Sequence, residues 1–262
     1  MHVETRGQGP DLVLLHGWAM HGGIWPASLL ESLAGQFRLH VIDLPGHGHS
    51  RPLREFTLGS ITQVLEDYAA SHLPGPAVWL GWSLGGLLAA EMAARCPRRV
   101  KRLVLVASSL CFCRRPDWPH AMDANVLRLF AEQLQKDYRA TLSRFLALQF
   151  QGDAHAREGL RRLREQLFAR GEPHGPSLDA GLQILLRADC RARAEDIDRP
   201  VLLLGGEHDT LTPAAALEAI APRFARAQAA IIKGAGHAPF VSHADAFEAR
   251  LRSFLDDGTG HE

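Results

Sequence analysis

The sequence contains no apolar run that approaches the roughly 18 residues needed to cross a bilayer. Residues 1–7 also lack the basic start and apolar core of a signal peptide. Neither sign of charge is in excess, because 29 Lys and Arg residues balance 29 Asp and Glu residues. We therefore expect a cytoplasmic protein that binds neither a membrane nor nucleic acid through its overall charge.

Cysteine is scarce, with only Cys96, Cys111, Cys113 and Cys190 in 262 residues. This number does not make a disulfide framework, and the pair at 111 and 113 lacks the second pair that a zinc site needs. The fourteen histidines are scattered and show no His-x-x-x-His pair with a third ligand. We expect reduced, partly buried thiols, no metal site and no cofactor.

Short apolar runs alternate with helical patterns along most of the chain, which is long enough for one substantial core. The nearly continuous apolarity of the runs is typical of strands in a parallel sheet that is covered on both faces. The expected strands are 12–15, 39–44, 77–80, 103–107, 201–204 and 229–232. The expected helices are 24–34, 59–72, 84–95, 214–221 and 244–255. This alternation predicts a doubly wound α/β fold with a mostly parallel sheet, followed by a tail at 256–262 that we expect to fray.

The alternation stops between about residues 109 and 189, where apolar residues recur at three- and four-residue steps. The segment is too long for an ordinary connection between two strands. We interpret it as a helical cap over the carboxyl edge of the sheet, where open α/β folds bind their ligands. The predicted division is a core in two parts, 1–108 and 191–262, with a cap at 109–190.

Residues 81–85 form a Gly-x-Ser-x-Gly pentapeptide between an apolar run and a helix-forming run. This context predicts a nucleophile elbow, in which a strand turns sharply into a helix and exposes the hydroxyl of Ser83. A serine hydroxyl needs an imidazole to take its proton, and the imidazole needs a carboxylate to hold its tautomer. The pattern therefore predicts a serine hydrolase with two further catalytic residues.

The two partners are expected in the order acid, then histidine, after the serine. Asp209 follows the strand at 201–204, and His237 follows the strand at 229–232. Both lie beyond the carboxyl ends of strands, so they can meet Ser83 at one edge of the sheet. Glu207 is the nearest alternative for the acid, and Asp117 is a more remote one.

A tetrahedral intermediate also needs N–H donors for its oxyanion. We expect one from the backbone of Leu84, directly after the nucleophile, and one from the backbone of Trp18, with its indole free to line the pocket. His16 is interpreted as a structural residue that holds this loop, because the catalytic base is expected late in the chain.

With these residues in place, the sequence resembles the α/β-hydrolase superfamily over essentially its whole length. It is more closely similar to the pimeloyl-[acyl-carrier protein] methyl ester carboxylesterases of biotin synthesis. The resemblance is carried by the segments 14–18, 41–46, 79–86, 144–149 and 237–240. It implies that Ser83, Asp209 and His237 form a triad, and that the substrate site is lined by Trp18, Leu84, Phe145, Leu146, Ala147, Leu148 and Gln149.

The predicted cap is rich in arginine, with seven arginines against three acidic residues between 139 and 170. On charge alone this is typical of a solvated helix face. The resemblance instead implies that an acidic acyl-carrier protein docks on Arg144, Arg157 and Arg161. Ala140 stands where the family has another arginine, and Arg139 beside it is a substitute. The implied function is hydrolysis of the pimeloyl methyl ester by a monomeric enzyme.

Three other functions remain open at this point. A broad short-chain carboxylesterase would use the same triad, because the triad does not decide which ester the cap admits. A lyase or a carbon–carbon bond hydrolase can share the scaffold. A non-catalytic binding protein could keep the fold and its pocket.

Overall fold

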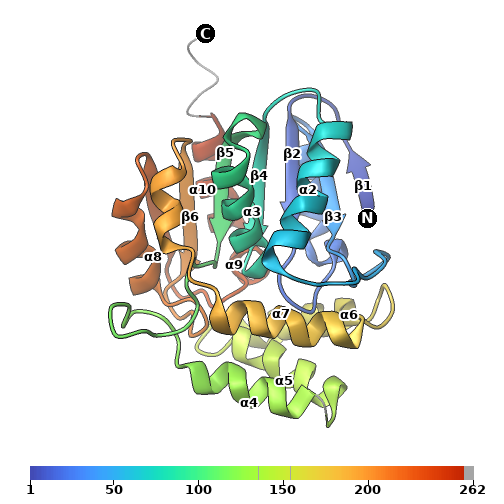
Figure 1. Cartoon of the computed structure of the whole chain (residues 1–262), viewed down its shortest axis with the longest axis vertical. Coiled ribbons are helices and arrows are strands. Elements are labelled where there is room, and N and C mark those ends of the chain that lie inside the picture. The colour runs from blue at the N-terminus through green and yellow to red at the C-terminus, as the bar shows by residue number, and fades with distance from the viewer. Residues whose placement is uncertain (135, 154, 257–262) are drawn as a thin grey trace.

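The computed structural model describes residues 1–134, 136–153 and 155–256, so part of the tail expected to fray lies outside the described residues. Its strands form one seven-stranded sheet in the order β1-β3-β2-β4-β5-β6-β7 (Figure 1). The strands are β1 (His2–Arg6), β2 (Asp11–Leu15), β3 (Arg38–Asp43), β4 (Ala77–Trp82), β5 (Val100–Val106), β6 (Val201–Gly206) and β7 (Ala227–Ile232).

The prediction of a mostly parallel sheet is confirmed. All neighbouring pairs from β3 to β7 run parallel, and only β1 pairs antiparallel with β3. The six expected strands are all present, but β1 was missed. Its residues are half-buried or exposed, so this edge strand lacks the apolar run that marked the others.

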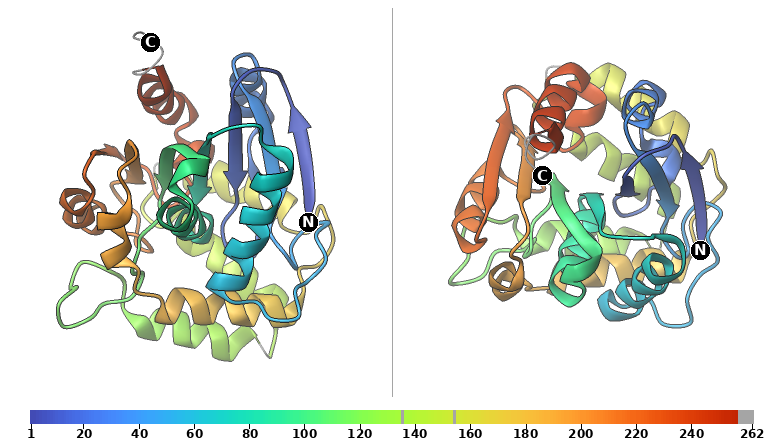
Figure 2. Two further views of the ribbon diagram at one scale, coloured as in Figure 1. Left: turned by 45° about the horizontal axis from the view of Figure 1, so that its top comes forward. Right: turned by 90° about the horizontal axis from the view of Figure 1, so that it is seen from above.

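Helices cover both faces of the sheet. In the view from above, α2, α3 and α8 lie on one face, and α1 and α10 lie on the other (Figure 2). The helices of the described residues are α1 (Ala27–Ala34), α2 (Leu58–His72), α3 (Leu84–Arg95), α4 (Ala124–Leu134), α5 (Tyr138–Gln149), α6 (Ala156–Leu167), α7 (Gly175–Arg187), α8 (Ala214–Ile220), α9 (Pro239–Ser242) and α10 (Ala244–Asp256).

The expected helix at 24–34 is instead a short 3₁₀ turn, Gly22–Ile24, followed by α1 from Ala27. Pro26 separates them with an extended backbone, at ψ 138°. Proline lacks an N–H and suits the start of a helix, so it divides the apolar pattern that suggested one element. None of the helices in the described part of the chain is long and apolar enough to cross a membrane.

Four helices, α4 to α7, lie between β5 and β6 in the chain and pack together beyond one edge of the sheet (Figure 1). The two helical stretches recognised in the sequence correspond to α4 and α5. The assignment of 109–190 as a separate cap remains a proposal about domain organisation.

Ion pairs fasten these inserted helices to the sheet. Arg170, between α6 and α7, forms ion pairs with Glu4 at 2.5 Å and with Asp43 at 3.1 Å. Burial alone would raise the pKa of Asp43, but hydrogen bonds from the backbone N–H groups of His49 and Gly22 leave it below its ordinary value. An anion held in this way is a firm anchor for a cation from the insertion.

The four cysteines are free thiols, as predicted, with Cys111 and Cys113 buried and Cys96 and Cys190 partly buried. Burial raises the pKa of Cys113 and of Cys190 to about 11. Such thiols are protonated at neutral pH and are therefore poor nucleophiles.

Candidate active site

Ser83 lies at the turn between β4 and α3, with its backbone at φ 54° and ψ −117°. A non-glycine residue at positive φ carries strain of about 1–3 kcal/mol. The turn is held by hydrogen bonds from Ser83 N–H to Val106 O at 2.9 Å and from Ser108 Oγ to Ser83 O at 2.7 Å. These contacts with the end of β5 and the residue beyond it hold the backbone of Ser83 in its strained conformation. The side chain is thereby presented at the edge of the sheet.

The flanking glycines are required by close backbone approach. A Cβ atom built on Gly81 would collide with the backbone of Gly85, and one built on Gly85 would collide with the carbonyls of Leu15 and His16. Only glycine lets β4, the start of α3 and the end of β2 approach this closely. The Gly-x-Ser-x-Gly pattern is thus explained by packing around Ser83.

Asp209 and His237 form a buried pair at the ends of β6 and β7. His237 Nδ1 lies 2.8 Å from Asp209 Oδ2, and both side chains are almost fully excluded from solvent. The other carboxylate oxygen of Asp209 accepts the backbone N–H groups of Leu211 and Thr212, each at 2.8 Å. A carboxylate accepts from Nδ1–H, so this pair fixes the tautomer in which Nε2 is free to take a proton.

The same contacts bring His237 next to the elbow. Trp82, the residue before Ser83, donates its indole N–H to the backbone oxygen of His237 at 2.8 Å. The Trp82 and His237 rings lie with centroids 5.7 Å apart. Ser83 itself is 94% buried, and its Oγ makes no hydrogen bond to any described residue. His237 is thus tied to Trp82, the residue that directly precedes Ser83.

The two alternative acids are engaged elsewhere. Glu207 is about half exposed and accepts the backbone N–H of Gly234 at 2.9 Å. Asp117 is largely exposed and pairs with Arg191 at 2.8 Å. Of the three candidate acids, Asp209 is the one that contacts His237.

The loop after β2 lies beside Ser83. A Cβ atom on Gly17 would stand 3.2 Å from the Cβ of Ser83. The backbone N–H groups of Trp18 and Leu84 donate to no described residue, which leaves both available as oxyanion donors. The indole of Trp18 is not free as expected: its Nε1 donates to Leu178 O of α7 at 2.8 Å, and its ring packs edge-on against Phe145.

His16 has the structural role predicted for it. Its Nε2 accepts the backbone N–H of Leu44 at 2.9 Å, which leaves Nδ1–H to donate to Gly17 O at 2.8 Å. Burial, with a smaller contribution from the neighbouring His47, lowers the pKa of His16 to about 3. The imidazole is therefore neutral at pH 7, and both of its ring nitrogens are engaged by the backbone.

The five residues 145–149 of α5 do not share one face. Phe145, Leu146 and Gln149 are buried, Leu148 is partly buried and Ala147 is exposed. This follows from helical geometry, because positions 145, 146 and 149 face one side and 147 faces another. Ala147 was expected to line the substrate site, and its exposed position does not fit that role.

The end of α5 is joined to the loops that hold Asp209 and His237, a feature that the sequence did not reveal. Gln149 O accepts the backbone N–H of His237 at 2.8 Å, and Asp153 Oδ2 accepts that of Gly236 at 2.8 Å. Gly152 O lies 2.6 Å from Nδ1 of His208, beside Asp209. In the sequence, Asp153 counted only as one of the acids of the insertion, but its side chain is fully buried.

Comparisons with known proteins agree with this geometry. The family model described as "alpha/beta hydrolase fold" matches residues 10–244. The chain is 48% identical to the pimeloyl-[acyl-carrier protein] methyl ester esterase of Xanthomonas axonopodis pv. citri, covering 97% of this chain and 98% of the relative. It is 46% identical to the enzyme of the same name from Nitrosomonas europaea, covering 94% and 96%. The chain belongs to the α/β-hydrolase family.

Among solved structures, an esterase from Exiguobacterium antarcticum superimposes with a TM-score of 0.89, covering 98% of this chain and 95% of that one. At 19% identity this likeness shows the fold alone. The family and the fold together make the protein a hydrolase, and they leave its substrate to be argued from its own residues.

The arginines discussed for residues 139–170 fall into two groups. Arg139 pairs with Glu172, Arg161 with Glu158 and Glu165, and Arg170 with Glu4 and Asp43 as described above. Arg144 instead donates to Gln133 at 2.8 Å, and Arg157 is exposed without a carboxylate partner among the described residues. Of the four arginines implied in docking, Arg144 and Arg157 thus carry unneutralised charge.

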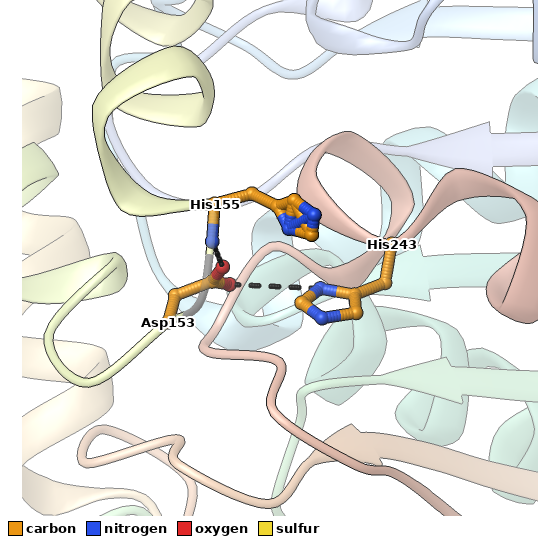
Figure 3. Close-up of side chains that lie close together, drawn as sticks. All are labelled: Asp153, His155 and His243. Atoms are coloured by element: carbon orange, nitrogen blue, oxygen red, sulfur yellow. Dashed lines mark hydrogen bonds and ion pairs between the residues drawn. The ribbon is translucent and has the colours of Figure 1, made fainter.

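One group of side chains in the hydrolase has the composition of a metal site, although the sequence predicted none. Metal-ligating atoms of Asp153, His155 and His243 all lie within 4.8 Å of one another (Figure 3). The three residues are far from the His-x-x-x-His pattern sought in the sequence, because His243 comes from a different part of the chain. The group includes neither Ser83, Asp209 nor His237, and it is considered below.

Proposed function

We propose that this protein hydrolyses the methyl ester of pimeloyl-[acyl-carrier protein], releasing methanol and the free carboxylic acid, as a step in biotin synthesis. The observation that carries the chemistry is the buried 2.8 Å contact between Asp209 and His237 beside the strained Ser83. The assignment of the substrate rests on the two relatives, whose names state that activity and which align with nearly the whole chain.

In the proposed mechanism, Ser83, His237 and Asp209 act as a catalytic triad. His237 Nε2 removes the proton of Ser83 as Oγ attacks the ester carbonyl carbon. The resulting imidazolium is stabilised by Asp209, which accepts the Nδ1–H throughout and stays ionised. The negative charge that develops on the former carbonyl oxygen is received by the backbone N–H groups of Trp18 and Leu84.

Collapse of this intermediate breaks the bond to the methoxy group, and His237 returns its proton to the departing methanol. Water then attacks the acyl-enzyme, with His237 accepting one proton from it, and Ser83 leaves as the free hydroxyl when that proton is returned. The product is a free carboxylate on the carrier-linked chain. No step requires a metal or a cofactor.

The inserted helices supply the proposed selectivity. Phe145 packs against the Trp18 indole at a centroid distance of 4.8 Å, which puts an apolar surface over the loop that holds the oxyanion donor. Gln149 is 99% buried, and its Oε1 has no hydrogen-bond partner among the described residues. We assign the pimeloyl chain to this apolar surface, with Gln149 as a polar contact at its end.

The carrier protein is assigned to the outer side of α5 and α6. Arg157, Arg161 and Arg164 recur at four- and three-residue steps, so they share one face of α6, and all are exposed. An acidic partner is attracted to such a face, which fixes its orientation and raises the encounter rate. The exposed pairs of Arg139 and Arg161 with glutamates do not prevent docking, because such pairs are worth only about 0–1 kcal/mol.

The decisive experiment incubates the purified protein with pimeloyl-[acyl-carrier protein] methyl ester and measures methanol and free acid. We expect equal amounts of the two products, and none from the Ser83→Ala variant. An intact substrate, under conditions in which a control esterase cleaves it, would rule out the proposal. Release of acid from small p-nitrophenyl esters alone would support a broad short-chain carboxylesterase instead.

A further inference from the structure

A group of two histidines and one carboxylate joins the inserted helices to the end of the chain. Asp153 follows α5, His155 immediately precedes α6, and His243 lies between α9 and α10. In Figure 3 the three side chains converge from these separate elements, and their metal-ligating atoms lie within 4.8 Å of one another. Neither the proposed reaction nor the docking face uses any of them.

Asp153 is the fixed member of the group. Its side chain is fully buried, and its Oδ2 accepts hydrogen bonds from Gly236 N at 2.8 Å and from Ser242 Oγ at 2.6 Å. Its Oδ1 accepts one bond, from the backbone N–H of His155 at 2.7 Å. A carboxylate oxygen has two acceptor positions, so Oδ1 retains one that no described residue fills.

The two imidazoles have lone pairs to offer. Neither ring nitrogen of His155 is hydrogen-bonded to a described residue, and its ring meets that of His243 edge-on at 4.9 Å between centroids. Nδ1 of His243 lies 2.9 Å from Ser242 Oγ and 3.9 Å from Asp153 Oδ2, while its Nε2 has no such partner. Unlike Asp153, both histidines border an open groove of about 460 Å³, so solvent can reach them.

We propose that Asp153, His155 and His243 bind one divalent cation of the zinc type and thereby clamp α6 to the corner between α9 and α10. Two imidazole nitrogens and one carboxylate oxygen are borderline ligands that suit Zn²⁺, Co²⁺ or Ni²⁺. Mg²⁺ and Ca²⁺ prefer oxygen ligands alone, so they are disfavoured here. Three protein ligands leave a further position for a water molecule from the groove, as in open zinc sites.

The geometry requires a modest movement of the histidines. Zinc–ligand bonds of about 2.0–2.2 Å place tetrahedral ligand atoms about 3.3 Å apart. The group is therefore wider than a filled site, and binding draws the two rings toward Asp153. Because the rings belong to α6 and to the α9–α10 corner, this closure links two elements that are distant in the sequence and stabilises the native state against unfolding.

The test uses tag-free protein and Zn²⁺ in competition with a chromophoric chelator. We expect the wild type to take up one equivalent, and His155→Ala and His243→Ala each to weaken binding at least about tenfold. His72→Ala is the matched control, because His72 is an exposed histidine on α2 that stacks on Tyr68. This variant should bind zinc as the wild type does.

A second readout follows the clamp directly. Zinc at about 100 times its dissociation constant should raise the thermal midpoint of the wild type and of His72→Ala by several degrees, and should raise that of His155→Ala by much less. His155 is exposed, so its replacement tests the site even if His243→Ala disturbs the fold. Co²⁺ in place of Zn²⁺ should give the visible absorption bands of a bound ion in the wild type and in His72→Ala, and not in His155→Ala or His243→Ala.

Three results would overturn the proposal. The first is that the wild type sequesters no zinc from the chelator. The second is that both cluster variants bind it as tightly as the wild type does. The third is that binding survives in His155→Ala and is lost in His237→Ala, since zinc would then occupy the proposed catalytic histidine. None of these outcomes depends on the ester substrate.

Discussion

The protein carries charge in two contrasting settings, the sheet edge around His237 and the outer surface of α6. At the sheet edge, Asp209 and His237 are almost fully buried, and every contact of the carboxylate is with a fixed backbone or ring atom. On α6, Arg161 reaches Glu158 and Glu165 with more than half of each side chain exposed. A buried pair of this kind fixes a geometry, whereas exposed pairs are screened by salt and readily exchange partners. The first setting suits chemistry and the second suits reversible docking.

The largest effect is expected from Ser83→Ala, which removes the proposed nucleophile and little else. The turn is held by backbone contacts and by Ser108, so the fold should persist while kcat for the carrier-linked ester falls about 10⁴–10⁶-fold. The measurement is steady-state methanol release, with thermal unfolding to check the fold. Ser71→Ala, on the exposed side of α2, should retain full activity. Residual activity within tenfold of the wild type would remove Ser83 from the mechanism.

The next largest effect separates Asp209 from its neighbour Glu207. Asp209→Asn should lower kcat by about 10⁴-fold, because an amide in that place no longer favours the Nδ1–H tautomer of His237. Glu207→Gln keeps an acceptor for Gly234 N at an exposed position and should change kcat less than about twofold. Both variants are compared on the same ester at saturating substrate. The reverse order of effects would transfer the acid to Glu207.

A smaller effect is expected on the free energy of unfolding at low pH. It arises from His16, which is buried like Asp209 and His237. His16 has a pKa of about 3 in the folded protein, because burial disfavours its charged form, against about 6.5 when unfolded. Between pH 3 and pH 6.5, His16 therefore binds a proton in the unfolded state and not in the folded state. The contribution of His16 to the free energy of unfolding is complete above pH 6.5 and is lost as the pH falls toward 3. At pH 5 the loss from His16 is about 2 kcal/mol.

Urea unfolding at pH 7.5 and at pH 5 measures this loss. His16→Gln should be less stable at pH 7.5, and its free energy of unfolding should change less between the two pH values than that of the wild type. His72→Gln is the matched control, since this exposed ring has no comparable burial, and it should follow the wild type. An unchanged pH dependence in His16→Gln would show that the acid loss arises at other groups.

The same contrast explains what the sequence could predict. Strands β2 to β7 and the order Ser83, Asp209, His237 were recognisable because buried parallel strands are apolar throughout and the loops after them carry the site. Edge strand β1 lacks that signature. The contacts of Gln149 and Asp153 with the His237 loop join residues more than 80 positions apart. The first joins two backbone atoms and the second has a backbone donor, and no residue type encodes a backbone contact. Likewise, the charge of the insertion was visible, but which arginines are paired depends on how the helices pack.

The smallest effect concerns the docking face, where exchangeable charge is expected to act on binding and not on chemistry. Replacing both Arg144 and Arg157 with Ala removes the two implicated arginines that have no carboxylate partner among the described residues. KM for the carrier-linked ester at low salt should rise about five- to thirtyfold, with kcat nearly unchanged, because each of the two rim charges contributes about 0.5–1 kcal/mol. Hydrolysis of p-nitrophenyl butyrate should not change, since that ester needs no docking.

The matched control is Arg250→Ala, because Arg250 is an exposed arginine on α10. High salt should raise KM of the wild type toward that of the double variant, and a wild-type KM that is insensitive to salt would assign recognition of the carrier to apolar contacts instead.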